Sequence, residues 1–211
     1  SHTAAAAALP GGACSDTVEF LNLTDGDGDT TREATLVVGT PTTVQSWPLD
    51  TDPGWATTGG WEFGVPLGGG GAACDPDPTA GHTGTNVYGY NLAGDYPRRL
   101  GVETLTAGPI DLSDTFQVSV HFWRWLGVQA SFADHAVFSV STDGSSFTPV
   151  WENDASANLP DGTWVEVGYD VSAIADGQSA VWLRWEMGPT SNNQQYCGWN
   201  LDDIRIEGIP S

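Results

Sequence analysis

YCGWNLDDIRIEG, residues 196–208, alternates like a β-strand but carries two adjacent carboxylates. Successive side chains of a strand point to opposite faces of the sheet. Ile204 and Ile206 therefore share one face, and Asp202 shares it with them, whereas Asp203 points the other way. If that face is the core, Asp202 is a buried carboxylate that needs a cation, hydrogen-bond donors or a proton.

Other strand-like segments occur along the whole chain, and the apolar spacing typical of helices is nearly absent. Gly, Pro, Asp and Asn separate these segments, and Asp143-Gly144 between two of them is typical of a hairpin turn. This pattern predicts an all-β fold, a two-sheet antiparallel β-sandwich or jelly roll. The strands are expected within residues 16–23, 33–39, 85–92, 116–128, 135–142, 148–153, 163–171, 180–187 and 201–208.

The composition divides the chain into three parts. Residues 1–15 are low-complexity Ala, Gly and Pro and are expected to be a linker or a processed end. Residues 16–46 are expected to be added N-terminal strands or an inter-domain segment, and residues 47–211 the sandwich domain. Within that domain, residues 50–100 form a long stretch rich in Gly, Pro, Asp and aromatic residues. Such a long loop is expected to be functional or pinned by its aromatic side chains.

The charge excludes several classes of partner. The formal net charge is −21, with 27 acidic residues against six Arg and no Lys. Nucleic acid is not an expected partner, because phosphate binding needs clustered cations. Membrane insertion is not expected either, since no apolar run approaches the roughly 20 residues that span a bilayer. An acidic surface suits salty water or the collection of divalent cations.

A second inward carboxylate is expected before the strand at 135–142. Asp134 lies in the alternation of Ala136 and Phe138, which places it on their face. Calcium binds carboxylate, carbonyl and water oxygens in flexible geometry, so it could neutralise such a group. The chain offers few cations of its own for the same purpose.

The sequence therefore predicts a calcium ion at Asp202, with Asp134 or Asp50 as the partner carboxylate. Asp52 is a further candidate, because the first strand of a jelly roll often pairs with the last. Asp203 joins the site only if the strand begins with a bulge. The alternative is that Asp202 or Asp203 caps backbone N–H groups of a neighbouring loop.

Aromatic side chains form the candidate ligand-binding surface. Trp123 and Trp125 lie opposite the aliphatic face of one strand, and Trp182 lies opposite that of another. Exposed rows of aromatic rings can stack on sugars or hold peptides. The alternative is that the 50–100 loop covers this face and turns the Trp residues into a second small core. Trp61 and Tyr90 in that loop are the remaining candidates.

The three cysteines show no metal or redox spacing. Cys197 immediately precedes GWNLDD, and Cys74 lies in the long loop. We predict a Cys74–Cys197 disulfide that pins the loop against the last strand and leaves Cys14 near the end of the chain. A disulfide favours an oxidising compartment.

Motifs for catalysis are missing. No H-E-x-x-H, G-x-S-x-G or glycine-rich phosphate-binding motif occurs in the sequence. An Asp/Glu pair for glycoside cleavage stays open, because the separation of two carboxylates in space is not visible in a sequence. We therefore expect a non-catalytic module, with a glycan-active enzyme or a purely structural subunit as alternatives.

Six blocks in order resemble the MAM-like jelly-roll modules of secreted bacterial proteins. That group includes cleaved-adhesin-like domains and modules attached to immune-inhibitor-type extracellular proteases. The resemblance covers about residues 47–208, and its blocks are DPGW…GGWEFGVP, DPDPTAGHTGTNVYGYNLAGDY, IDLSDTFQVSVHFWRWLGV, DHAVFSVSTDGSSFTPVWEN, WVEVGYDVSAIADGQSAVWLRWEMG and YCGWNLDDIRIEG.

The resemblance implies a two-sheet sandwich, secretion, frequent calcium sites and an adhesive or accessory role. The expectation is therefore a secreted, calcium-stabilised module that binds polysaccharide or extracellular protein, or builds an extracellular assembly, as part of a larger polypeptide. Fold alone does not name the ligand.

Overall fold

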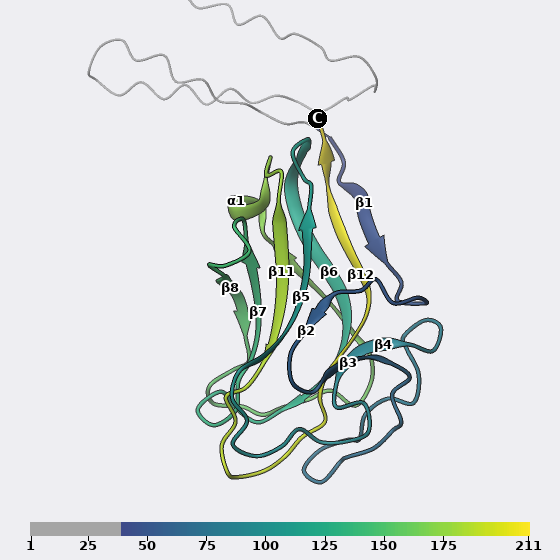
Figure 1. Ribbon diagram of the computed structural model, residues 1–211, viewed down its shortest axis with the longest axis vertical. Helices are drawn as coiled ribbons and strands as arrows, with labels where there is room; N and C mark the ends of the chain where they lie inside the picture. Colours follow the sequence, from purple (N-terminus) through teal and green to yellow (C-terminus); the bar gives the residue numbers. More distant parts are fainter. Residues whose placement is uncertain (1–38) are drawn as a thin grey trace, which may run out of the picture.

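Two antiparallel β-sheets pack face to face in this protein, as the strand pattern predicts (Figure 1). The computed structural model describes residues 39–211, so the expectations for residues 1–38, including Cys14, lie outside the described residues. The larger sheet has the strand order β10-β6-β12-β4-β3, with β1 beside β12 and β9 beside β6, and the smaller sheet has the order β2-β5-β11-β7-β8.

The strands of the larger sheet are β1 (Thr42–Trp47), β3 (Trp61–Gly64), β4 (Val87–Tyr90), β6 (Thr115–Val128), β9 (Leu159–Pro160), β10 (Val165–Asp170) and β12 (Gly198–Pro210). Those of the smaller sheet are β2 (Ala56–Thr57), β5 (Glu103–Ile110), β7 (Ala136–Ser141), β8 (Thr148–Glu152) and β11 (Val181–Met187). One helical turn, α1 (Ser172–Ala175), follows β10. No helix of the described range is long and apolar enough to cross a membrane.

The core lies between the two sheets and is made by the alternation that the sequence predicts. Every second residue of β11 is buried, and in β6 Val118, Val120 and Phe122 are fully buried. The Phe122 ring lies 5.4 Å from the ring of Phe138 and 5.5 Å from that of Trp185, both on the smaller sheet. Burying large aromatic side chains of this kind supplies much of the stability of a sandwich.

The last strand does not alternate as expected, because it contains a β-bulge. The register of β12 against β6 shifts between Asp202 and Arg205, and Asp203 has a φ of 47°. Leu201 and Ile204 both belong to the core, whereas Asp202 lies opposite Trp123 on the outer face of the sheet. The expectation that Asp202 shares the core face with Ile204 is therefore wrong, since the extra residue shifts the alternation by one position.

The first described strand pairs with the last, as expected for a jelly roll. Trp47 at the end of β1 lies opposite Ile204 of β12. The turn that follows β1 is therefore held beside the bulge, and this turn contains Asp50. β1 thus consists largely of residues that the sequence analysis placed before the sandwich domain.

The stretch expected as a long loop, residues 50–100, contains three short strands. Between β3 and β4 the chain has no regular structure over residues 65–86, which we call the covering loop. In Figure 1 this segment lies beside β3 and β4, at the end of the sandwich opposite the C-terminus. The irregular segments thus gather at one end, where binding sites of sandwich domains are commonly found.

We expect Phe122→Ala to lower the free energy of unfolding by about 3–5 kcal/mol, because it removes a ring that contacts both sheets. The matched control is Phe132→Ala, at a position that is 72% exposed, which should change stability by no more than about 0.5 kcal/mol. Urea denaturation measures both values. Equal losses in the two variants would show that Phe122 does not lie in the core.

Candidate functional site

The covering loop lies on the outer face of the larger sheet and is fixed there by hydrogen bonds. The Leu67 N–H donates to the carbonyl of Leu92 at 2.8 Å, and the Trp125 indole N–H donates to the carbonyl of Pro76 at 3.1 Å. The loop therefore covers part of the surface that carries Trp123 and Trp125. The alternative that this loop buries the Trp face is confirmed in part, since both Trp side chains are half-buried.

Asp202 is fully buried beneath the covering loop. Its Oδ2 accepts a hydrogen bond from the Thr83 N–H at 3.0 Å, and its Oδ1 accepts one from the Asp203 N–H at 2.8 Å. Burial raises the pKa of the Asp202 carboxyl to about 6, and these backbone hydrogen bonds oppose the rise. The capping of loop N–H groups that the sequence analysis gave as an alternative is thus present in the structure.

Oxygen atoms converge beside Gly81, next to the same carboxylate. The position that a Cβ would occupy on Gly81 lies 2.3 Å from the Thr83 carbonyl, 2.6 Å from Asp202 Oδ2 and 2.9 Å from the Asn86 carbonyl. A side chain at position 81 would fill this space. Carbonyl and carboxylate oxygens are the ligands that calcium prefers, so the donor set fits this ion.

Asp50 borders the same segment of the covering loop. Its Oδ1 lies 2.5 Å from the position of a Cβ on Gly84, and its carbonyl accepts a hydrogen bond from the Asn86 side chain at 3.0 Å. Within residues 39–211, no group of three or more His, Cys, Asp or Glu side chains could hold a metal ion. A cation at this place would therefore need backbone carbonyls in addition to Asp202 and Asp50.

The bulge turns Asp203 toward the covering loop as well. Asp203 Oδ1 accepts a hydrogen bond from the Thr83 hydroxyl at 2.8 Å, and Oδ2 lies 2.7 Å from His82 Nδ1. The His82 ring stacks on Trp123 at 3.6 Å. The condition set for Asp203, a bulge, is fulfilled, although the bulge lies inside β12 rather than at its start.

Two of the expected calcium ligands have other partners. Asp134 is buried, but its oxygens accept hydrogen bonds from the Tyr96 hydroxyl and the Ser191 N–H, both at 2.6 Å. The Asp52 Oδ1 accepts a hydrogen bond from the Tyr88 hydroxyl at 2.6 Å. Asp134 and Asp202 share no hydrogen-bond partner among the described residues, and the three oxygen atoms nearest a Cβ on Gly81 do not include one of Asp134.

A groove of about 410 Å³ runs between the covering loop and the segment that leads into β10. Trp125 and Trp164 line it, with their rings 6.2 Å apart at 78°, and both side chains are half-buried. The remaining lining comes from residues 75–81 of the covering loop and from Gly162. The groove therefore offers indole surface beside the exposed Asp75, whereas the carboxylate of Asp77 is buried.

Trp182 cannot share a binding surface with Trp123 and Trp125. It lies in β11, on the outer face of the smaller sheet. A Cβ on Gly144 would lie 3.0 Å from its ring, so the β7–β8 turn packs directly against the indole. The three Trp residues that the sequence analysis grouped together thus belong to opposite surfaces of the sandwich.

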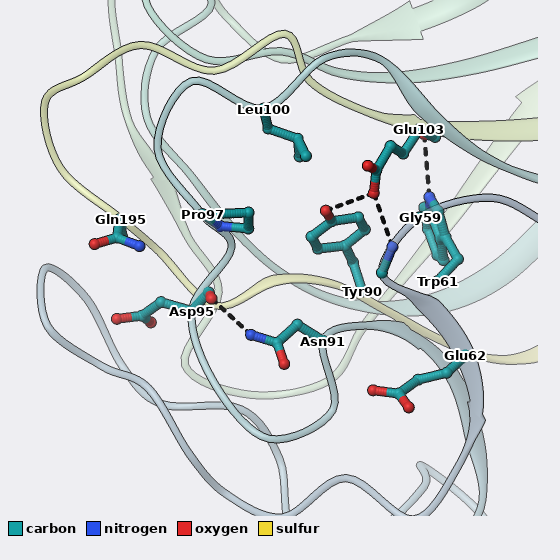
Figure 2. A pocket seen from close by; sticks show the side chains of 11 residues that line it. Gly59, Trp61, Glu62, Tyr90, Asn91, Asp95, Pro97, Leu100, Glu103 and Gln195 are labelled. Atoms are coloured by element: carbon teal, nitrogen blue, oxygen red, sulfur yellow. Dashed lines mark hydrogen bonds between the residues drawn. The ribbon is translucent and has the colours of Figure 1, made fainter.

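A second cleft, of about 530 Å³, contains Trp61 and Tyr90 (Figure 2). Both rings are almost fully buried and pack edge to face at 5.9 Å. The Tyr90 hydroxyl donates to Glu103 Oε2 at 2.7 Å, and the Trp61 indole N–H donates to the Glu103 carbonyl at 3.1 Å. These two aromatic residues therefore use their polar groups inside the protein and offer little ring surface to a ligand.

The carboxylates of the second cleft fix loops in place. Glu103 Oε2 also accepts a hydrogen bond from the Gly60 N–H, and Glu62 Oε1 accepts one from the Leu92 N–H. Asp95, on the far side of the cleft in Figure 2, accepts from two N–H groups of the covering loop. Each carboxylate of this cleft thus has a structural partner.

Cys74 and Cys197 lie next to each other, as predicted, but as two free thiols. A Cβ on Gly127 would lie 2.5 Å from the sulfur of Cys197 and 2.9 Å from that of Cys74, so the glycine leaves room for the pair. A hydrogen bond from the Cys197 thiol lowers the pKa of Cys74. The structure therefore brings the covering loop and the last strand together at these sulfurs without the S–S bond, which stays a prediction.

A buried acid–amide pair joins the covering loop to β12. Asp77 is 2% exposed, and its Oδ1 accepts a hydrogen bond from the Asn200 side-chain amide at 2.7 Å. Asp77 Oδ2 and Asn200 Oδ1 are buried without a hydrogen-bond donor. Burial raises the pKa of Asp77 to about 7, the bond from Asn200 opposes this, and the negative charge of Asp95 adds to it.

Three residues of the site, Trp164, Asp77 and Gly81, are not among those expected from the sequence. Trp164 precedes β10 by one residue and lies within the strand expected at 163–171, where the alternation places it on the face opposite Val165 and Val167, a signal that could have identified it. Asp77 and Gly81 lie in an irregular segment, where no alternation indicates which side chain is buried. For Asp77 and Gly81, the only signal in the sequence is the unusual length of the irregular stretch that contains them.

Similarity to known proteins is limited. No family model matches the chain. Over 160 residues it is 26% identical to bacillopeptidase F of Bacillus subtilis (strain 168), a match that covers 74% of this chain and 10% of that protein. The chain thus spans about a tenth of the length of this curated relative.

Solved structures that are similar include the K1 cleaved adhesin domain of Lys-gingipain from Porphyromonas gingivalis W83. It is 17% identical, with a TM-score of 0.49, and the match covers 81% of this chain and 99% of that one. Another is the CBM22-1 xylan-binding domain from Paenibacillus barcinonensis, at 14% identity and a TM-score of 0.46, covering 83% of this chain and 99% of that one.

The acid–amide pair predicts a pH-dependent stability. The pKa of Asp77 is about 7 in the folded state against 3.8 ordinarily, so the folded state binds the proton more tightly. Stability should fall as the pH rises from about 4 to about 7, by on the order of 2–4 kcal/mol from this group. Asp77→Asn removes this loss, because an amide can donate to the Asn200 oxygen and carries no charge.

Urea denaturation at pH 4 and pH 8 measures the difference. The Asp77→Asn variant should match the parent at pH 4 and exceed it at pH 8. The control is Asp75→Asn, an exposed position two residues away, whose difference from the parent should be nearly constant. A pH-independent difference for Asp77→Asn would contradict the interpretation.

Proposed function

We propose that this chain is a non-catalytic, secreted β-sandwich module that binds polysaccharide in the groove between Trp125 and Trp164. One observation carries the proposal: two half-buried indole rings line an open groove beside carboxylate side chains. Sugar rings have apolar faces that pack on indole, and their hydroxyl groups donate hydrogen bonds to carboxylates.

The groove is a better candidate for sugar binding than the cleft of Figure 2, because its aromatic rings are more exposed. Trp61 and Tyr90 are 3% and 2% exposed, so a sugar could not stack on them without rearrangement. Trp125 and Trp164 retain exposed surface, and the indole N–H of Trp125 fixes its ring by bonding to Pro76. A ring that is held in place binds with a smaller loss of side-chain entropy.

We further propose that a calcium ion stabilises the covering loop. Asp202, Asp50 and the carbonyls of Thr83 and Asn86 would hold the ion, and the space at Gly81 supports this assignment. The ion would neutralise a buried carboxylate whose pKa burial raises to about 6. Because the groove wall at residues 75–81 leads directly into this segment, the ion would also fix the shape of the groove.

The proposal includes no catalytic residue. Glu62, Asp95 and Glu103 surround the cleft of Figure 2, where a glycan-cleaving pair would be sought first. Their hydrogen bonds to backbone N–H groups and to Tyr90 account for them as anchors of the surrounding loops. A module of this kind would bring a larger secreted polypeptide to its substrate, and the partial match to bacillopeptidase F supports a place in a longer chain.

We expect Trp125→Ala and Trp164→Ala each to weaken polysaccharide binding at least about tenfold, since buried aromatic contacts dominate binding energy. Affinity electrophoresis in gels that contain xylan, β-glucan, glycol chitosan or glycol chitin measures the change. The control is Trp182→Ala, on the opposite face of the sandwich, which should bind like the parent.

Two outcomes would contradict the proposal. Equal binding by the parent and the Trp125→Ala variant would move the site elsewhere, and absence of binding to all four polymers by the parent would remove it. Release of reducing ends that is lost in Glu103→Gln would instead show an enzyme that uses the cleft of Figure 2.

Calcium should raise the melting temperature of the parent. At a calcium concentration a hundredfold above the dissociation constant, binding to the folded state alone stabilises by about 2.7 kcal/mol. For a chain of this size this corresponds to a shift of about 5–11 °C.

Asp202→Asn should abolish the shift, whereas Asp114→Asn, in an exposed turn, should retain it. Thermal melts in millimolar calcium and in EDTA measure the shift, and an unchanged midpoint in the parent would exclude the ion.

A further inference from the structure

We propose that the groove beside Trp125 and Trp164 selects polysaccharides that carry positively charged amino groups, such as chains of glucosamine. This inference rests on the proposed function and adds the charge of the ligand to it. The groove combines two indole rings with two carboxylates, and the following features of its lining carry the inference.

The first feature is the charge of the lining. Asp75 and Asp77 line the groove, and its lining contains no Lys, Arg or His. Asp75 is exposed, and its Oδ2 lies 2.4 Å from the position of a Cβ on Gly162. The carboxylate therefore reaches from the covering loop to the opposite wall of the groove. An ammonium group placed there would find a charged hydrogen-bond acceptor.

The second feature is the unsatisfied oxygen of Asp77. The side chain is 2% exposed, and Oδ2 has no hydrogen-bond donor. The Asn200 amide donates to the other oxygen, Oδ1, and the ionisable groups that interact with Asp77 are Asp95 and Cys197, neither of which supplies a positive charge. A buried carboxylate without a counter-charge is costly, so a cation in the groove would stabilise its ionised form.

The third feature is that the basic side chains of Arg124 and His82 are each paired with a carboxylate outside the groove lining. The Arg124 guanidinium bonds to Asp161 at 3.0 Å and lies 5.1 Å from the Trp151 ring, toward the core. The His82 Nδ1 lies 2.7 Å from an oxygen of Asp203, and the His82 ring packs edge to face on Trp164 at 6.4 Å. The exposed carboxylate of the groove lining is that of Asp75, because the Asp77 carboxyl is buried and its pKa of about 7 leaves it mostly protonated near pH 6. The net charge of −21 favours a cationic ligand over an anionic one.

The shape of the groove favours a sugar over a cationic peptide. Its wall, residues 75–81, has no regular secondary structure, so it presents no strand edge for main-chain pairing with a peptide. Because the two rings lie at 78° to each other, a pyranose ring could stack on one indole while the other borders it. An amino sugar stacked in this way would place its ammonium group near Asp75. A positive charge near an indole face is itself attracted to the ring.

The experiment compares hexamers of β-1,4-linked glucosamine and N-acetylglucosamine at about pH 6, where the amine is protonated. The two differ at the amino group alone. Isothermal titration calorimetry of the full chain should show tighter binding of the glucosamine hexamer, by about tenfold, and this preference should shrink as salt is added. Asp75→Asn should weaken the glucosamine hexamer about threefold to tenfold and weaken the acetylated hexamer less.

The controls separate this inference from the proposed function. Asp114→Asn, in an exposed turn outside the groove lining, should keep the preference, and Trp125→Ala should lose both hexamers. Equal affinity for the two hexamers, or a preference that Asp75→Asn does not reduce, would overturn the charge selection while polysaccharide binding stands. If the parent binds neither hexamer and none of the four polymers, both the charge selection and the proposed polysaccharide binding are overturned. Stronger Asp75-dependent binding of an oligolysine than of either hexamer would show that the groove takes cationic peptides, and would overturn the sugar class.

Discussion

The bulge at Asp203 in the last strand is the constraint on which the rest of the candidate site depends. Its extra residue moves Asp202 from the core face to the outer face of the sheet, opposite Trp123. It also turns Asp203 toward Thr83, so that adjacent carboxylates hold the same loop residue. Without the bulge, one carboxylate would face the core and the covering loop would lose its main attachment to β12.

The covering loop then has a physical reason to remain in place despite its lack of regular structure. Its backbone N–H and carbonyl groups need partners, and they find them in side chains of the sheet and of the neighbouring loop. Asp95 and Asp202 supply these partners on one side, and Trp125 supplies one on the other. The Asn200 amide adds a hydrogen bond to the Asp77 side chain of the loop. The loop in turn forms the wall of the groove that carries Asp75 and Asp77. Trp125 therefore both anchors the loop and lines the groove.

Acidic side chains are also concentrated between the covering loop and β12. Three carboxylates, those of Asp77, Asp202 and Asp203, are buried or half-buried between the covering loop and β12. Burial raises the pKa of Asp77 and of Asp202, which shows that each pays a desolvation cost in the ionised form. A calcium ion at Asp202 and a cationic ligand near Asp77 would each relieve part of this cost. The two proposals therefore share one physical origin, although they concern different oxygens.

The sequence by itself determined the class of fold and much of the core. Alternation in residues 116–128 and 180–187 predicted which face of β6 and β11 is buried, because a strand with one buried face repeats every two residues. It also predicted the pairing of the first strand with the last, the burial of Asp134 and Asp202, and the proximity of Cys74 to Cys197.

Only the tertiary structure decided on which face Asp202 lies. The bulge adds one residue to the strand, and the types of the residues around it do not indicate its position. Only the tertiary structure, too, separated Trp182 from Trp125 and joined Trp125 to Trp164 and Asp77. Those groupings depend on which sheet each strand joins and on how an irregular loop folds over it, and local periodicity carries no information about either.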